Sequence, residues 1–135
     1  MKGTINCILL IDDDSATNFI HKVLLEQIVR PKEIVAVENG LKALEYLKTR
    51  VNGRYPRPDL ILLDINMPVM NGWEFLDKYN HLDNSQRADR LILMMTTTLS
   101  PEKMSEAQTN PIIDGLMNKP MDTDLVNELL KEYFD

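Results

Sequence analysis

Cysteine is nearly absent from this sequence, and that scarcity excludes several classes of protein. Cys7 is the only cysteine among 135 residues, so the chain has no internal disulfide and no cysteine-based zinc site, a usage typical of a reducing compartment. A secretory signal is also missing, as is any apolar run of the roughly 18 residues that a membrane span needs. We therefore expect a soluble, cytoplasmic protein that does not enter a membrane.

Positive charge is scarce as well. The chain has 15 Lys and Arg against 21 Asp and Glu, a formal net charge of -6. Because clustered basic residues supply the binding to phosphate backbones, we expect no direct contact with nucleic acid. The length suits one globular core, and the composition of 44% hydrophobic and 27% charged residues is ordinary for one. We therefore expect a single domain over residues 1–135.

Short apolar runs alternate with stretches of helical spacing along the chain. The runs lie at 5–11, 34–37, 60–63, 91–95 and 112–117, and nearly continuous apolar runs are typical of parallel strands buried on both faces. Helical spacing follows each run, at about 16–28, 41–47, 73–79, from 101 onward, and at 125–133. Five strands alternating with five helices predict an α/β fold with a doubly wound parallel sheet.

The first helix shows its pattern most clearly. Its apolar side chains recur at the spacing of one helical face, which predicts the buried side of the helix: Ala16, Phe19, Ile20, Val23, Leu24 and Ile28. His21 falls on the polar side, and His81 lies near the end of the third helix. We expect both histidines to be solvated surface residues without a role in proton transfer.

Polar residues collect where the expected strands end. In open parallel sheets, ligands bind beyond the carboxyl ends of the strands, and the residues at those positions are Asp12, Asp13, Asp14, Asp64, Asn66, Thr96 and Lys119. Two carboxylates about 4 Å apart repel by roughly 4 kcal/mol at an effective dielectric constant of about 20, so such a cluster needs a counter-ion. Oxygen ligands alone favour Mg²⁺, or else Mn²⁺.

A cation beside a carboxylate, with a lysine and a threonine converging on it, is also what phosphoryl transfer requires. The cation and the ammonium neutralise charge on the transferred group, and the hydroxyl donates a hydrogen bond. The carboxylate can itself be the acceptor and form an aspartyl phosphate. Taken singly, Asp12 to Asp14 read as helix caps and Asp64 as a turn residue, so only their conjunction at successive strand ends indicates a site.

Four segments give the chain a resemblance to the receiver domain of two-component response regulators, including the chemotaxis receivers. They are Leu-Leu-Ile-Asp-Asp-Asp at 9–14, Leu-Leu-Asp-Ile-Asn-Met-Pro at 62–68 with Asn-Gly at 71–72, Met-Thr-Thr at 95–97 and Asn-Lys-Pro at 118–120. The resemblance runs over nearly the whole chain. It implies a flavodoxin-like (βα)5 fold whose five-stranded parallel sheet has the order 2-1-3-4-5.

The resemblance also implies roles for the acidic residues. Asp64 would be the phosphoacceptor. Mg²⁺ would be bound directly by Asp13, by Asp64 and by the backbone carbonyl of Asn66, with Asp12 acting through a bound water.

Further roles come from the same resemblance. Thr96, Thr97 and Lys119 would bind the phosphoryl group, and the Lys119–Pro120 peptide would be cis. Thr96 and the residue at position 116 would form the switch that reports phosphorylation. The family usually has an aromatic residue there, whereas this chain has Leu116, so we expect a shallower switch.

Partners follow from the resemblance too. The phosphodonor would be a sensor histidine kinase or a histidine phosphotransfer protein, docking on the first helix and the loops around the site. The output would be a downstream protein that reads a changed surface. The chain would not be an enzyme beyond Mg²⁺-dependent self-phosphorylation and self-dephosphorylation.

The sequence leaves open two alternative functions and one question about the architecture of the protein. A phosphatase with an aspartate nucleophile would share the cation site, but it would usually carry a second aspartate two residues later as general acid, where this chain has Asn66. A constitutive interaction module would have lost its switch, as Leu116 suggests. The receiver is either a free-standing protein or a part of a longer regulator.

Overall fold

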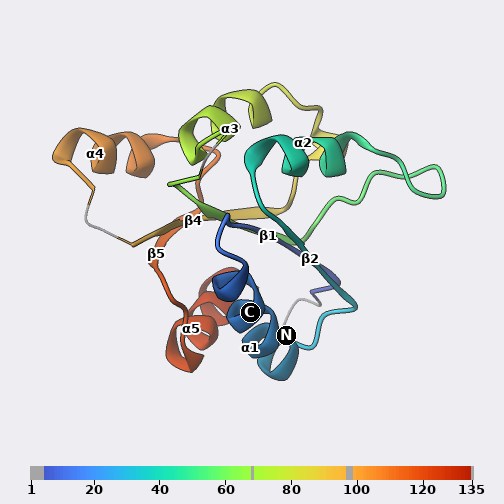
Figure 1. Ribbon diagram of the computed structural model, residues 1–135, viewed down its shortest axis with the longest axis horizontal. Helices are drawn as coiled ribbons and strands as arrows, with labels where there is room; N and C mark the ends of the chain where they lie inside the picture. Colours follow the sequence, from blue (N-terminus) through green and yellow to red (C-terminus); the bar gives the residue numbers. More distant parts are fainter. Residues whose placement is uncertain (1–4, 68, 97–98, 135) are drawn as a thin grey trace.

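The fold is a five-stranded parallel sheet between two layers of helices (Figure 1). The computed structural model describes residues 5–67, 69–96 and 99–134. Neighbouring strands follow the order β2-β1-β3-β4-β5, which confirms the order implied by the sequence. The strands are β1 (Cys7–Ile11), β2 (Glu33–Val37), β3 (Leu60–Asp64), β4 (Arg90–Met95) and β5 (Gly115–Asn118).

The helices divide between the two faces of the sheet. In Figure 1, α2, α3 and α4 lie above the sheet, while α1 and α5 lie below it. Their bounds are α1 (Ser15–Ile28), α2 (Gly40–Lys48), α3 (Gly72–Tyr79), α4 (Pro101–Thr109) and α5 (Thr123–Tyr133), with a single 3-10 turn at Asn84–Gln86. Two buried apolar clusters result, one on each face of the sheet.

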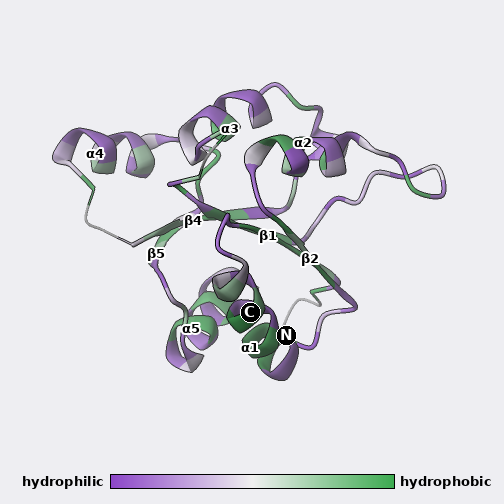
Figure 2. Ribbon diagram, in the orientation of Figure 1, coloured by the Kyte–Doolittle hydropathy of each residue, from purple (hydrophilic) through white to green (hydrophobic). Residues whose placement is uncertain are grey.

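The strands form where the sequence is most continuously apolar, because both faces of the sheet are covered. All five residues of β3 are buried, and Figure 2 shows the central strands as mainly hydrophobic between helices whose outer sides are largely hydrophilic. Alternate side chains of β1 go to opposite clusters: Leu9 and Ile11 to one, Ile8 and Leu10 to the other. Each face of the sheet therefore forms one side of a hydrophobic core.

Side-chain caps fix where the helices begin. Asp14 caps α1 by accepting from the amide of Ala16 at 3.0 Å. Asp122 likewise caps α5 through the amide of Leu125. Such caps satisfy amide groups that the first helical turn leaves without partners. In the part of the chain that the structure describes, no helix has the length and hydropathy to cross a membrane.

The fifth strand is shorter than expected. The apolar pattern predicts a strand over 112–117, but β5 runs from Gly115 to Asn118. The reason is a turn held by Asn110, whose side chain accepts from the amide of Ile112 at 3.0 Å and whose carbonyl accepts from Ile113 at 3.1 Å. Ile112 and Ile113 therefore pack against the core from a turn instead of a strand.

The orientation of α1 differs most from the expectation. The buried residues of this helix are Asn18, His21 and Leu25, which lie on one face at helical spacing. Phe19 and Ile20, expected in the core, are 67% and 53% exposed. The predicted apolar face is therefore wrong for its exposed part, whereas Leu24 and Ile28 do pack against the core. The solvated position predicted for His21 is wrong as well.

Candidate functional site

Three carboxylates meet where β1 and β3 end. The two strands are neighbours, with Ile11 beside Leu63, so the residues that follow them lie at the same edge of the sheet. One carboxylate oxygen from each of Asp12, Asp13 and Asp64 lies within 4.8 Å of the others. Asp12 and Asp64 are only 4% and 3% exposed, whereas Asp13 faces solvent.

Backbone contacts hold Asp12 in place. Its amide extends the ladder toward β2 by donating to the carbonyl of Val37 at 3.1 Å. Its carboxylate Oδ1 accepts from the amide of Asp14 at 2.9 Å, and its carbonyl accepts from the side-chain amide of Asn18 at 2.9 Å. Both the backbone and the side chain of Asp12 are therefore fixed before any ligand binds.

Asp64 occupies an electrostatically costly position at the end of the central strand. Burial and, after it, the nearby charge of Asp12 raise the pKa of its carboxyl from 3.8 to about 6, although Lys119 and the amide of Asn66 act in the opposite direction. Desolvation disfavours the charged form, and a neighbouring like charge adds to that cost. The site therefore needs positive charge to balance the carboxylate of Asp64.

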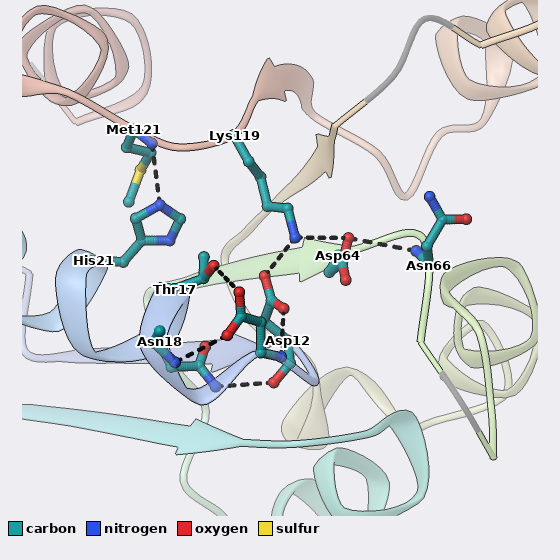
Figure 3. Close-up of polar contacts among 10 residues, drawn as sticks. Asp12, Thr17, Asn18, His21, Asp64, Asn66, Lys119 and Met121 are labelled. Atoms are coloured by element: carbon teal, nitrogen blue, oxygen red, sulfur yellow. Dashed lines mark hydrogen bonds and ion pairs between the residues drawn. The ribbon is translucent and has the colours of Figure 1, made fainter.

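Lys119 supplies part of that compensation. Its ammonium lies 2.8 Å from Oδ2 of Asp12 and 3.3 Å from Oδ1 of Asp64, as Figure 3 shows. Burial lowers the pKa of Lys119, but the hydrogen bond and charge of Asp12, followed by those of Asp64, outweigh this and raise it overall. The lysine follows β5 directly, and its amide donates to the carbonyl of Met95 at 2.8 Å. The Lys119–Pro120 peptide is cis, the isomer expected from the sequence.

The loop after Asp64 bends back closely over the strand end. The amide of Asn66 points at Oδ1 of Asp64 at 3.4 Å, and the amide of Gly72 donates to the carbonyl of Ile65 at 2.8 Å. A Cβ at position 72 would lie 2.8 Å from the Cα of Ile65 and 2.9 Å from the carbonyl oxygen of Asp64. Only glycine permits this approach, so the start of α3 is pressed against the backbone of Asp64.

The other predicted site residues lie at or near the same edge. Thr96 follows β4 directly and is exposed, and β4 lies between β3 and β5 in the sheet. Leu116 lies within β5, half-buried, and packs against the cluster on the α2, α3 and α4 face. Thr97, predicted to bind the phosphoryl group, lies outside the described residues.

Two side chains from the same helix join the site without having been predicted there. Figure 3 shows Asn18 and His21 on α1, next to the segments that carry Asp12 and Lys119. The sequence offered one signal for them: Asn18, His21 and Leu25 share a helical face that begins directly after the acidic residues. The hydrophobic spacing pointed to a different face of α1, because the neighbouring face of the helix is more apolar.

The stripe that α1 leaves exposed lies close to the acidic edge. Phe19, Ile20 and Val23 are exposed, and they line a shallow hollow of about 290 Å³ with Leu24, Gln27 and Met121.

The donor set at this edge fits a hard divalent cation. Within the described ranges, the clustered ligand atoms are carboxylate oxygens, and oxygen ligands suit Mg²⁺ or Mn²⁺. Two of the three carboxylates are buried, and burial together with the charge of Asp12 raises the pKa of Asp64. A bound cation would offset this unfavourable negative charge.

Comparison with known proteins gives consistent results. Residues 8–131 match the sequence profile of the response regulator receiver domain. The chain is 31% identical over 126 residues to the chemotaxis protein CheY of Halobacterium salinarum, covering 93% of each. It is 28% identical to the crystal structure of a two component response regulator from Cytophaga hutchinsonii, with a TM-score of 0.77 over 96% of this chain and 97% of that one.

One relative is much longer than the match. The protein-glutamate methylesterase/protein-glutamine glutaminase of Desulfotalea psychrophila is 35% identical over 98 residues, but the chain covers only 24% of its length. The similarity therefore concerns a minor part of that protein.

Proposed function

The chain is a response regulator receiver domain, and from that premise we propose that Asp64 accepts a phosphoryl group. Receiver domains of the CheY type act as phosphorylation switches in two-component signalling. The observation that carries the assignment is the position of Asp64, which is buried at the end of the central strand with the ammonium of Lys119 at 3.3 Å. We assign residues 1–135 to one such domain.

The reaction needs an ionised Asp64. With a pKa of about 6, its carboxylate is mostly ionised at neutral pH and is available as a nucleophile. A carboxylate oxygen of Asp64 attacks the phosphorus of a phosphohistidine, the new O–P bond forms as the N–P bond breaks, and the departing imidazole nitrogen takes a proton from solvent. Lys119 balances charge on the incoming group, and the hydroxyls of Thr96 and Thr97 donate hydrogen bonds to its oxygens.

Asp13, Asp64 and the backbone carbonyl of Asn66 would hold Mg²⁺ directly, or Mn²⁺ in its place, with Asp12 acting through a water. When bound, the ion supplies charge neutralisation on the oxygens of the transferred group. The grouping of Asp12, Asp13 and Asp64 within 4.8 Å supports this assignment. So does the raised pKa of Asp64, since an ion would offset the repulsion from Asp12.

The donor is a sensor histidine kinase or a histidine phosphotransfer protein, which docks on α1 beside the acidic edge. The exposed stripe of Phe19, Ile20 and Val23 supports this choice, because a phosphohistidine delivered to Asp64 must come from a protein seated next to Asp13 and Asp14. A downstream protein then reads the phosphorylated state on a different surface.

The switch runs from Thr96 to Leu116 and is shallow. Leu116 is half-buried against the core, and exposing its remaining buried surface to water would be unfavourable. It therefore stays inward in both states, and the change on phosphorylation falls in the loop before α4. Amide chemical shifts with and without a phosphoryl mimic would locate that change.

Catalysis as a phosphatase that hydrolyses other phosphorylated molecules is not part of this function. The position two residues after Asp64 is Asn66, whose side-chain amide is far too weak an acid to protonate a leaving group. The activity is limited to self-phosphorylation and self-dephosphorylation.

The test is incubation with acetyl phosphate and Mg²⁺, followed by the intact mass. We expect one acid-labile phosphoryl group on the unchanged chain and none on Asp64→Asn. Asp59→Asn is the matched control, because Asp59 precedes the same strand at its other end, and it should be phosphorylated as the unchanged chain is. Removing divalent cations with a chelator should prevent the reaction.

Equal phosphorylation of Asp64→Asn and the unchanged chain would assign the phosphoryl group to another residue. Release of many phosphate ions per chain each minute would indicate a hydrolase instead.

A further inference from the structure

A histidine in the core of this protein links two segments that are far apart in the sequence. His21 on α1 is only 2% exposed. Its Nε2 lies 3.0 Å from the backbone amide nitrogen of Met121, 100 residues further along the chain, as drawn in Figure 3. The contact joins α1 to the turn that leads from β5 into α5.

The direction of this hydrogen bond fixes the state of the imidazole. A backbone amide can only donate, so Nε2 must accept, and the ring must be neutral with its proton on Nδ1. Burial lowers the pKa of His21, and Lys119 lowers it further, although Asp12 acts in the opposite direction. The neutral form that the contact requires is therefore also the form that the surroundings favour.

Met121 is separated from Lys119 only by Pro120, so whatever holds its amide also holds the lysine backbone. On the other side of the turn, the amide of Lys119 donates to Met95 of β4 at 2.8 Å. The turn is thus tied at one end to the sheet and at the other end to α1.

The same helix also holds the partner of that lysine. One turn before His21, the side-chain amide of Asn18 donates to the carbonyl of Asp12 at 2.9 Å. Two neighbouring side chains of α1 therefore bind the segments that carry Asp12 and Lys119. The ammonium of Lys119 lies 2.8 Å from Asp12 and 3.3 Å from Asp64 across that junction.

We infer that His21 is a positioning residue for phosphoryl transfer: by accepting the Met121 amide, it fixes the backbone from which Lys119 reaches Asp12 and Asp64. This inference rests on the proposed function of Asp64. Lysine has a long side chain with many rotamers, and its ammonium stays in place only if its backbone does. Small displacements of a charged group at a reacting centre cost rate, while the oxygen atoms proposed to bind the cation belong to Asp13, Asp64 and Asn66 and not to the turn.

The test compares two substitutions at one position. His21→Leu removes the acceptor and keeps an apolar side chain in the core, whereas His21→Gln keeps an acceptor at a similar reach. The measurement is the rate of phosphorylation by acetyl phosphate at saturating Mg²⁺, together with the Mg²⁺ dissociation constant. The matched control is His81→Leu, since His81 is exposed at the end of α3.

We expect His21→Leu to be phosphorylated about tenfold more slowly, with an unchanged Mg²⁺ dissociation constant. His21→Gln should recover most of the rate, and His81→Leu should match the unchanged chain. Equal rates for His21→Leu and the unchanged chain overturn the inference. So does a loss of Mg²⁺ affinity as large as the loss of rate, because that reports general damage to the site.

A measurement on the unchanged chain needs no variant. We expect a scalar coupling between the amide nitrogen of Met121 and Nε2 of His21, and its absence overturns the inference even if His21→Leu fails to fold. If the unchanged chain takes up no phosphoryl group, the proposed function fails and the inference falls with it. If the unchanged chain is phosphorylated and His21→Leu keeps its rate, the inference alone fails.

Discussion

Carboxylates lie at both ends of the central sheet, but they meet opposite surroundings. At the amino end, Asp59 accepts from the amides of Asn6 and Cys7 at 2.6 and 2.9 Å. Asp114 accepts there from the amide of Leu91 at 2.8 Å. These acids join strand backbones to each other, and each has donors of its own.

At the carboxyl end, Asp12, Asp13 and Asp64 crowd one another, and the ammonium of Lys119 is shared between Asp12 and Asp64. Burial and the charge of Asp12 raise the pKa of Asp64 to about 6. The difference teaches that an aspartate whose side chain accepts backbone amides of a neighbouring strand is structural. A buried aspartate crowded by other aspartates is ready for chemistry.

The largest effect we expect is at the amino end. Asp59→Ala leaves two backbone amides without an acceptor, so the free energy of unfolding should fall by about 3 kcal/mol. Urea denaturation followed by circular dichroism measures this change. Asp59→Asn keeps one acceptor oxygen and should lose less. If Asp59→Ala proved as stable as the unchanged chain, Asp59 would have no structural role, and the contrast between the two ends of the sheet would be wrong.

At the carboxyl end we expect a substitution to raise the free energy of unfolding instead of lowering it. Without divalent cations at pH 8, Asp64→Asn should raise the free energy of unfolding by about 2 kcal/mol, because it removes a buried charge beside Asp12. The same denaturation measures it. A destabilised Asp64→Asn would show that Lys119 already compensates the cluster in full.

The pH dependence sharpens this second expectation. Asp64 keeps its proton up to a pKa of about 6 in the folded chain, against an ordinary value of 3.8, so folding takes up a proton between those values. Its contribution to stability is therefore largest below pH 3.8 and is lost as the pH rises through 6. The advantage of Asp64→Asn should disappear below pH 3.8, grow between pH 3.8 and about 6 and stay constant above that, and saturating Mg²⁺ should reduce it.

How far the sequence predicts this site depends on the kind of residue. Asp12, Asp64 and Lys119 could be placed because apolar strands end where polar residues begin, and parallel strands end at one edge. Asn18 and His21 could not, since hydrophobic spacing assumes that apolar residues face the core. The carbonyl of Asp12 and the amide of Met121 need partners, and α1 turns its polar face inward to provide them. Local rules fail at such sites because satisfying buried polar groups outweighs burying one more apolar stripe.

The turn before β5 shows a second limit. Ile112 and Ile113 have the composition of a strand, but the side chain of Asn110 takes the amide of Ile112. A single side-chain acceptor replaces a ladder hydrogen bond, and apolar composition carries no information about it.

A third expectation concerns neighbouring acids within the carboxyl end. Asp13 belongs to the acidic cluster, whereas Asp14 accepts from Ala16 and Thr17 as the cap of α1. Asp13→Asn should weaken Mg²⁺ binding about tenfold, which is about 1.4 kcal/mol, and Asp14→Asn should weaken it much less. Titration calorimetry measures both. Equal losses would mean that net charge, and not ligation, holds the cation.

The smallest effect is expected for an aspartate whose side chain takes part only in an exposed ion pair. Asp89 lies 3.7 Å from Arg57, and both side chains are more than half exposed. Exposed ion pairs contribute about 0–1 kcal/mol, so Asp89→Asn should change the free energy of unfolding by less than about 0.5 kcal/mol. A loss comparable to that of Asp59→Ala would mean that position at the amino end matters more than amide contacts do.

The order of the strands has a consequence for how the chain is made. Lys119 and Asp12 lie 107 residues apart, and β5 occupies the edge of the sheet next to β4. A ribosome therefore releases Asp12, Asp13 and Asp64 well before the residue that neutralises them. Until β5 has docked, a growing chain carries an acidic edge without its lysine. Competence to signal is thus acquired only when the sheet is complete.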